Sequence, residues 1–154
     1  MKTINFDKIP NQYAKGKGWM GVPKSNDALY IDKYNKWYFI EFKNGYIKLE
    51  DIYRKIYDSL IMLLEWNIIP DFEFCRRNIN YILVYNEEVY GKIQPSVSRQ
   101  KTYEYISKLA KKEVCLFHID KLKDYLFSET HTYNKEMFNE KFILEKEKEE
   151  VGVS

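Results

Sequence analysis

The chain has 154 residues, a length that suits one domain with a single hydrophobic core. Hydrophobic residues make up 45% of the sequence and charged residues 31%, a balance that excludes a disordered chain. With 25 basic and 23 acidic residues, the net charge of +2 does not by itself indicate a nucleic-acid-binding protein. We therefore expect a single domain over residues 1–154, with a function set by local arrangements of residues.

The cysteine and targeting patterns place limits on the compartment. The two cysteines, Cys75 and Cys115, form no CxxC pair and have no histidine at the spacing of a zinc site. The first residues contain no apolar signal segment. The longest apolar run, residues 60–64, is far too short to span a bilayer. We therefore expect a cytoplasmic protein with reduced thiols and no membrane partner.

The N-terminal part of the chain is basic and rich in loop-forming residues. Residues 1–24 carry five lysines and one acid, and residues 7–25 contain many Gly, Pro, Lys and Asn residues. This composition predicts a basic loop with at most one short helical turn. Residues 27–33 and 37–43 are rich in aromatic and β-branched side chains on either side of a short polar turn, a pattern that predicts a β-hairpin.

The register of this hairpin decides which side chains share a face. A loop over residues 33–35 suits Asn35, which tolerates a left-handed backbone. That loop sets Asp27 opposite Glu41, on the same face of the sheet. A loop one residue shorter sets Asp27 opposite Phe42 and on the wrong face, because neighbouring residues of a strand point to opposite faces.

The middle of the chain alternates helical and strand patterns. Apolar residues recur at helical spacing over residues 48–66 and again over residues 98–112. Residues 80–86 form an apolar run typical of a strand buried on both faces, and residues 114–119 predict a further strand.

The C-terminal part is expected to be less ordered. A last helix begins near Tyr133, and the charged residues that follow it predict a frayed tail over residues 145–154. His118 is expected inside a strand and His131 in a polar loop. The order of the elements predicts an α/β (α+β) fold, with a mixed central sheet and helices on both of its faces.

Acidic and basic side chains gather at one edge of the expected sheet. Residues two apart in a strand share a face, so Glu41 and Lys43 point the same way. Asp27 opens the partner strand. Two carboxylates and a lysine in this arrangement can hold a hard divalent cation and position a water molecule beside a phosphate.

Asp27, together with the Glu-x-Lys sequence at residues 41–43, resembles the motif of the PD-(D/E)xK nuclease superfamily. As in that family, the motif lies on a hairpin that is followed by a helix and a buried strand. The segments 23–27 and 36–43 are most similar to the resolvase-type members, and the resemblance covers residues 25–120. It implies a restriction-endonuclease-like fold and a metal-dependent endonuclease that hydrolyses DNA phosphodiester bonds, with a structure-specific substrate as one option.

The resemblance also implies roles for individual residues. Asp27, Glu41 and the backbone carbonyl of Phe42 would bind Mg²⁺ or Mn²⁺. Lys43 would orient or help to deprotonate the attacking water and offset the charge that develops on the phosphate. DNA as the partner and a homodimer as the assembly rest on the resemblance alone.

Several basic residues are candidates for contacts with nucleic acid, because phosphate contacts require only positive charge. They precede the hairpin or lie on or near the helix that follows it: Lys15, Lys17, Lys24, Lys48, Arg54 and Lys55. In the family that the chain resembles, this helix often supplies a Lys, Arg or Gln to the site, and the last three residues are candidates for that position. A solvated loop explains the three N-terminal lysines equally well.

The chain departs from the family pattern in two respects. The residue before Asp27 is Asn26 rather than proline, which is a common variation. The family usually carries a glutamate on an N-terminal helix, and no glutamate precedes Glu41 in this sequence. Three alternatives follow: a site with two acids, a site completed by another subunit, or a domain that binds nucleic acid or a partner protein without cutting. An ordinary cross-strand charge pair, which stabilises a sheet by ~0.2–1 kcal/mol, also fits the pattern.

Overall fold

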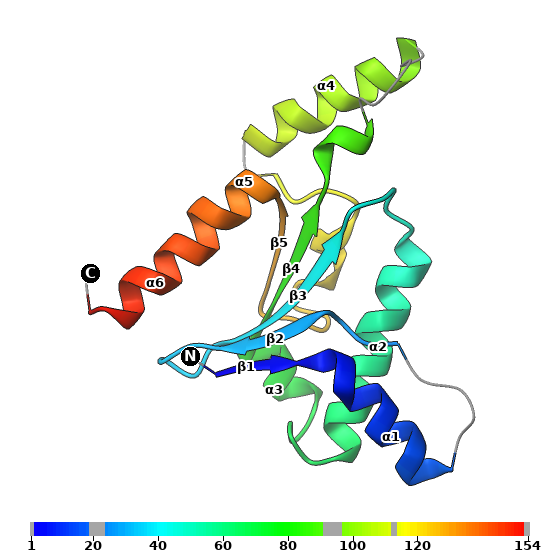
Figure 1. Cartoon of the computed structure of the whole chain (residues 1–154), viewed down its shortest axis with the longest axis vertical. Helices are drawn as coiled ribbons and strands as arrows, with labels where there is room; N and C mark the ends of the chain where they lie inside the picture. Colours follow the sequence, from blue (N-terminus) through cyan, green and yellow to red (C-terminus); the bar gives the residue numbers. More distant parts are fainter. Residues whose placement is uncertain (1, 19–23, 91–96, 112–113, 153–154) are drawn as a thin grey trace.

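The computed structural model contains a five-stranded mixed sheet in the order β1-β2-β3-β4-β5 (Figure 1). Strands β1 and β2 are antiparallel, as are β2 and β3, whereas β3, β4 and β5 run parallel to one another. The strands are β1 (Lys2–Asn5), β2 (Ala28–Ile31), β3 (Trp37–Lys43), β4 (Ile79–Tyr85) and β5 (Glu129–Asn134). The structure describes residues 2–18, 24–90, 97–111 and 114–152.

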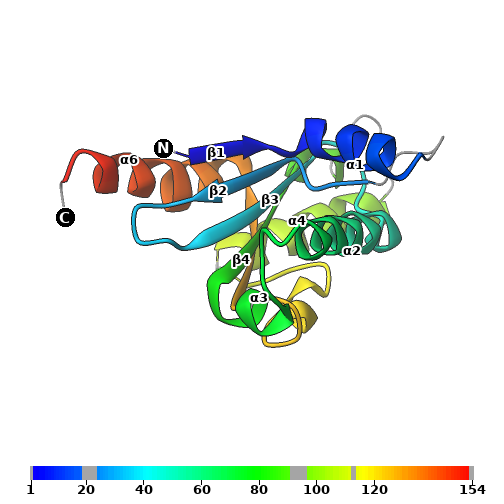
Figure 2. The same cartoon turned by 90° about the horizontal axis from the view of Figure 1, so that it is seen from below.

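Helices lie on both faces of the sheet, and α4 projects beyond the end of β4, as Figures 1 and 2 show. The helices in the described ranges are α1 (Ile9–Lys17), α2 (Leu49–Glu65), α3 (Phe72–Asn78), α4 (Val97–Lys111), α5 (Lys135–Phe138), a π-helical turn (Asn139–Ile143) and α6 (Leu144–Glu150). Helices α2 and α3 contribute to the larger core on one face, and α5 with the π-helical turn packs on the other. Within these ranges no helix is long and apolar enough to cross a membrane. The coarse prediction of a mixed α/β sheet between helices is confirmed.

The predicted helix over residues 48–66 is confirmed as α2. Its buried side chains include Ile52, Ile56 and Leu63, which recur every three or four residues and face the sheet. Glu50 and Asp51 lie in the first turn, where negative charge stabilises the helix dipole. This packing fixes the rotation of α2 about its axis and therefore decides which of its polar side chains face β3.

The predicted register of the hairpin is also confirmed. Ala28 pairs with Ile40 along the β2–β3 ladder, so the next residues outward on the two strands are Asp27 and Glu41. Asn35 has a φ of 62°, the left-handed conformation that the three-residue loop requires. The loop thereby places Asp27 beside Glu41.

The prediction of a loop-rich N-terminal segment over residues 1–24 is wrong in its described part. Strand β1 and helix α1 both lie in this segment. Helix α1 has Pro10 in its first turn, buries Tyr13, and ends at Gly18 with a φ of 70°. Tyr13 also packs against Trp66 at the end of α2. The helix depends on these tertiary contacts, which its weak apolar pattern does not reveal.

The strand predicted over residues 114–119 is wrong as well. Phe117 and His118 have φ values of 58° and 57°, which end any extended conformation, and His118 is exposed rather than part of a core. The fifth strand is β5, and His131 lies on it rather than in a loop. The buried threonines of β5 give it a polar sequence, which explains why its apolar pattern is weak.

The tail predicted to fray over residues 145–154 is helical as far as Glu150, so that prediction is wrong for α6. Lys146 is buried and donates hydrogen bonds to Asp32 Oδ2 at 2.9 Å and to the Tyr38 hydroxyl at 3.1 Å. Burial alone would raise the pKa of Asp32, but the hydrogen bonds from Lys146 and from the hairpin loop lower it below its ordinary value. This ion pair fastens α6 to the hairpin across 114 positions of sequence.

We expect Lys146→Ala to lower the free energy of unfolding by about 3 kcal/mol or more, because it leaves the buried Asp32 carboxylate without its charged partner. The matched control is Lys148→Ala, which removes an exposed pair with Glu145 and should cost less than about 1 kcal/mol. Urea unfolding at neutral pH measures both changes. Equal losses in the two variants would contradict the buried role of Lys146.

Candidate active site

The two candidate acids lie together at the C-terminal end of β3. Asp27 directly precedes β2, and Glu41 lies two residues before the end of β3. Phe42 donates its backbone N–H to Asp27 Oδ2 at 2.7 Å, so the Asp27 side chain continues the ladder where β2 has not yet begun. The N–H and C=O of one strand residue point to the same neighbour, so the Phe42 carbonyl also points toward Asp27 and away from β4.

Glu41 is the buried member of the acid pair. Its side chain is 0% exposed, its Oε1 accepts a hydrogen bond from Lys55 Nζ, and its Oε2 is buried without a partner among the residues that the structure describes. Burial raises the pKa of Glu41 to about 7, an effect that the negative charge of Asp27 reinforces and the hydrogen bond from Lys55 opposes. The carboxyl group therefore ionises close to neutral pH.

Lys55 bridges the two acids from α2. Its Nζ binds Glu41 and lies 3.7 Å from Asp27 Oδ1. Burial lowers the pKa of Lys55, but the hydrogen bond to Glu41 and the charges of both acids raise it above the ordinary value, so the ammonium is charged at neutral pH. Lys55 thus places one positive charge at the acid pair.

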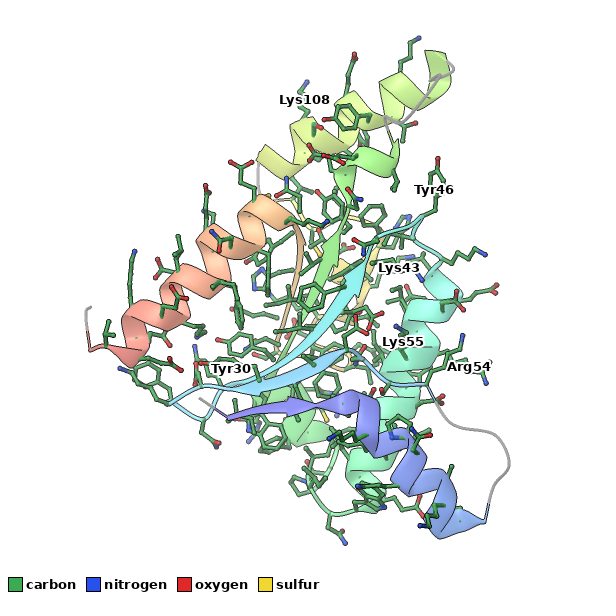
Figure 3. The ribbon with its side chains drawn as sticks, viewed as in Figure 1. Tyr30, Lys43, Tyr46, Arg54, Lys55 and Lys108 are labelled. Atoms are coloured by element: carbon green, nitrogen blue, oxygen red, sulfur yellow. The ribbon has the colours of Figure 1, made fainter. Side chains whose placement is uncertain are left out.

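Of the three candidates on or near this helix, only Lys55 reaches the acids. Arg54 extends from the outer side of α2, as Figure 3 shows, and its guanidinium lies 3.9 Å from Asp58. Lys48 is exposed just before the helix begins. The sequence did not distinguish these residues, because the choice depends on the rotation of α2.

Lys43 shares the face of Glu41 by strand alternation and is half-buried at the last position of β3, close to the start of α2 (Figure 3). Its charge is among those that lower the pKa of Asp51, after the larger effect of the hydrogen bond from Lys24. Within the described ranges Lys43 forms no ion pair. Its ammonium is therefore available to a group that binds near Glu41.

Further polar groups near the acids have no partner. The side-chain amide of Asn26 and the hydroxyl of Tyr81 are buried without hydrogen bonds among the described residues. Burial, together with the charges of Glu41 and Asp27, raises the pKa of Tyr81 far above its ordinary value. Unpartnered buried polar atoms are rare in folded proteins and call for a functional or solvent explanation. The sequence pattern did not indicate Tyr81, although a tyrosine hydroxyl within a fully buried strand is unusual.

The donor set suits a hard cation with a small number of protein ligands. Asp27, Glu41 and the Phe42 carbonyl offer the oxygen ligands that Mg²⁺ and Mn²⁺ prefer. No cluster of three or more His, Cys, Asp or Glu side chains with metal-binding geometry occurs in residues 2–18, 24–90, 97–111 and 114–152. A cation held here would complete its coordination with water, as Mg²⁺ commonly does. Lys55 would have to release Glu41 to admit it.

The structure does not supply the missing upstream acid from α1. That helix has no acidic residue in its first turn, and its Tyr13 and Lys17 bind Glu65 at the far end of α2. Glu65 lies ten positions after Lys55 on α2, a distance of about 15 Å along the helix. Glu65 therefore cannot act as a third ligand beside Asp27 and Glu41.

The N-terminal lysines form no ion pair with Asp27 or Glu41 in the described part of the chain. Lys17 is bound to Glu65, and Lys15 is exposed near the end of α1. Lys24 donates its backbone N–H to Asp58 at 2.9 Å and its Nζ to Asp51 at 3.3 Å. Lys24 therefore fixes the segment that leads into Asp27 against α2, a structural role the sequence did not predict.

Stability should depend on pH through Glu41. Its pKa is about 7 in the folded chain and 4.5 without the protein environment, so the folded state holds the proton more tightly. The free energy of unfolding should therefore fall as the pH rises from about 5 to 8, by up to about 3 kcal/mol from this group. In Glu41→Gln the part of this pH dependence that comes from residue 41 should be absent. Urea unfolding in EDTA compares the two proteins, and parallel pH profiles would show that Glu41 is not buried as described.

Comparison with protein families, with curated proteins and with solved structures found no match to this chain. The chemistry of the site therefore rests on its own geometry. That geometry is a half-buried and a fully buried carboxylate bridged by Lys55, with Lys43 on the same face.

Proposed function

We propose that the protein is a metal-dependent nuclease that hydrolyses phosphodiester bonds in DNA. The observation that carries the proposal is the pairing of a fully buried carboxylate, Glu41, with Asp27 and a bridging ammonium from Lys55. Burying a carboxylate costs free energy, and the fold nevertheless keeps Glu41 buried near the end of β3. Such an arrangement is typical of a site that binds cations and ionises near neutral pH.

Each residue at the site would have a separate role in phosphodiester hydrolysis. Asp27, Glu41 and the Phe42 carbonyl would hold Mg²⁺ or Mn²⁺. When bound, the cation supplies Lewis acidity to a phosphate oxygen and lowers the pKa of a water molecule. Lys43 would orient that water and stabilise the charge that develops on the phosphate. Lys55, once released from Glu41, would lie within reach of the same phosphate.

The order of elements supports a restriction-endonuclease-like fold of the PD-(D/E)xK type as part of this proposal. The β2–β3 hairpin, the covering helix α2 and the buried parallel strand β4 follow one another in the order that the resemblance implies. The β2–β3 register puts Asp27 beside Glu41, as the motif needs. A second subunit, in the dimer that the resemblance to resolvase-type members implies, would supply the acid that has no counterpart upstream of Glu41.

A module on the same fold that binds DNA or a partner protein without cutting is the second candidate. Two observations favour it: no third acid joins the pair among the described residues, and Lys55 already neutralises Glu41. The two candidates differ in the requirement for a metal. A nuclease needs the cation at the acids, whereas a binding module functions with Lys55 in its place.

The nuclease is tested by incubating the purified chain with plasmid, linear and branched DNA in Mg²⁺ or Mn²⁺, with EDTA as the metal control. We expect cleavage that requires metal and that falls by about a hundredfold or more in Glu41→Gln and Lys43→Ala, because each removes a group acting on the transition state. Lys148→Ala is the control for loss of a surface charge, because this exposed residue lies on α6 away from the acids, and it should retain cleavage.

Two results would decide against the nuclease. Full activity in both Glu41→Gln and Lys43→Ala would show that the cleavage comes from elsewhere. Absence of cleavage on every substrate, with DNA binding retained, would favour the binding module.

A further inference from the structure

A groove of about 450 Å³ lies away from the acid pair, on the α6 side of the sheet and at the start of the parallel strands. Its walls come from the hairpin loop, from the end of α3 and from the segment of the π-helical turn and α6. The volume lies in the range of sites that hold small organic ligands. The acid pair occupies the other face and the other end of β3, so the two sites are separate.

The floor of the groove carries an unpartnered amide. Asn80 lies on β4, is 7% exposed, and forms no side-chain hydrogen bond with any part of the chain that the structure describes. An asparagine amide presents one donor and one acceptor side by side, and it recognises the edge of a nucleobase through two hydrogen bonds. A buried amide at the bottom of an open groove therefore favours a ligand with a complementary donor–acceptor edge.

An aromatic ring stands at the wall of the groove. Tyr34 is 64% exposed, and the ammonium of Lys33 lies 5.1 Å from its ring centre. Its backbone N–H donates to Asp32 Oδ1 at 2.9 Å, which fixes the loop beneath the ring. Stacking on an exposed tyrosine is a general mode of base recognition that does not depend on which base is bound.

The lining of the groove has more basic than acidic side chains. Four are lysine or arginine (Lys36, Arg77, Lys141 and Lys146) and three are glutamate (Glu129, Glu145 and Glu149). Lys36, at the rim, has no ion pair within the described ranges. Tyr38 pairs with Asn80 across the β3–β4 ladder, and Lys36 lies two residues before Tyr38. Two residues of strand span about 6.6 Å, so Lys36 is offset from Asn80 by about this length along the strands. That spacing is comparable to the separation of base and phosphate in a nucleotide.

The π-helical turn supplies a further wall of the groove through Lys141 and Phe142. Single π-helical turns within longer helices are rare and are often found at functional sites. Its position over the groove is an independent sign that this face of the molecule binds a ligand.

We propose that this groove binds a nucleotide, with the base edge on the Asn80 amide, the base stacked on Tyr34 and the phosphate near Lys36. The ligand chemistry is a nucleobase with a phosphate, and it could come from a free mononucleotide or from the end of a strand. The proposal does not depend on catalysis at Asp27 and Glu41.

The test is calorimetric titration with AMP, GMP, CMP and UMP, with the corresponding nucleosides, with inorganic phosphate, and with a short single strand bearing a 5′-phosphate. We expect at least one nucleotide to bind with a Kd below about 1 mM. Asn80→Leu should weaken this binding tenfold or more. Lys36→Ala should weaken nucleotide binding but leave nucleoside binding unchanged. Lys121→Ala, an exposed lysine outside the groove, is the control for charge alone.

Glu41→Gln should bind nucleotide as the unaltered chain does, which separates the groove from the acid pair. If Asn80→Leu does not fold, Tyr34→Ala on the exposed loop tests the same contact surface and should also weaken binding tenfold. If the single strand binds and the mononucleotides do not, the groove is a nucleotide site whose ligand is the end of a strand. Absence of binding by every nucleotide and strand, binding of inorganic phosphate with equal affinity, or unchanged binding in Tyr34→Ala and Lys36→Ala would overturn the proposal.

Discussion

The burial of the Glu41 carboxylate near the C-terminal end of β3, the central strand of the sheet, is the constraint on which the rest of the site depends. A carboxylate without exposure to water needs a positive partner, and α2 provides it through Lys55. The apolar packing of α2 sets the rotation that brings Lys55 to Glu41. Asp27 then shares the same ammonium and accepts the Phe42 N–H, so one buried charge organises two strands and a helix.

The β2–β3 hairpin connects the acid pair with the groove on the opposite face of the sheet. One end carries Asp27 and Glu41 on the α2 face. The other end carries the loop with Asn35 and the buried Asp32–Lys146 pair, which holds α6 against the opposite face. Fixing the register through a three-residue loop therefore positions the acid pair and the nucleotide groove at once.

The sequence predicted those features that short-range rules control. The loop chemistry of Asn35 determined the register, and the apolar repeat located α2, so the shared face of Asp27, Glu41 and Lys43 followed from alternation. Features that depend on contacts between distant parts of the sequence could not be predicted by these rules. The selection of Lys55 over Arg54 depends on how α2 packs, and the order of α6 depends on a partner 114 positions away. Helix α1 and strand β5 were missed because tertiary contacts compensate for their weak apolar patterns.

The most direct test of the account is a calorimetric titration of Mn²⁺ into the metal-free chain near pH 7, beside Asp27→Asn. We expect binding by the unaltered chain with release of a proton, because Glu41, with a pKa of about 7, must ionise to hold the cation. Binding and proton release should both be lost in the variant. No binding to the unaltered chain, or equal binding by the two proteins, would contradict the claim that the acid pair is a cation site.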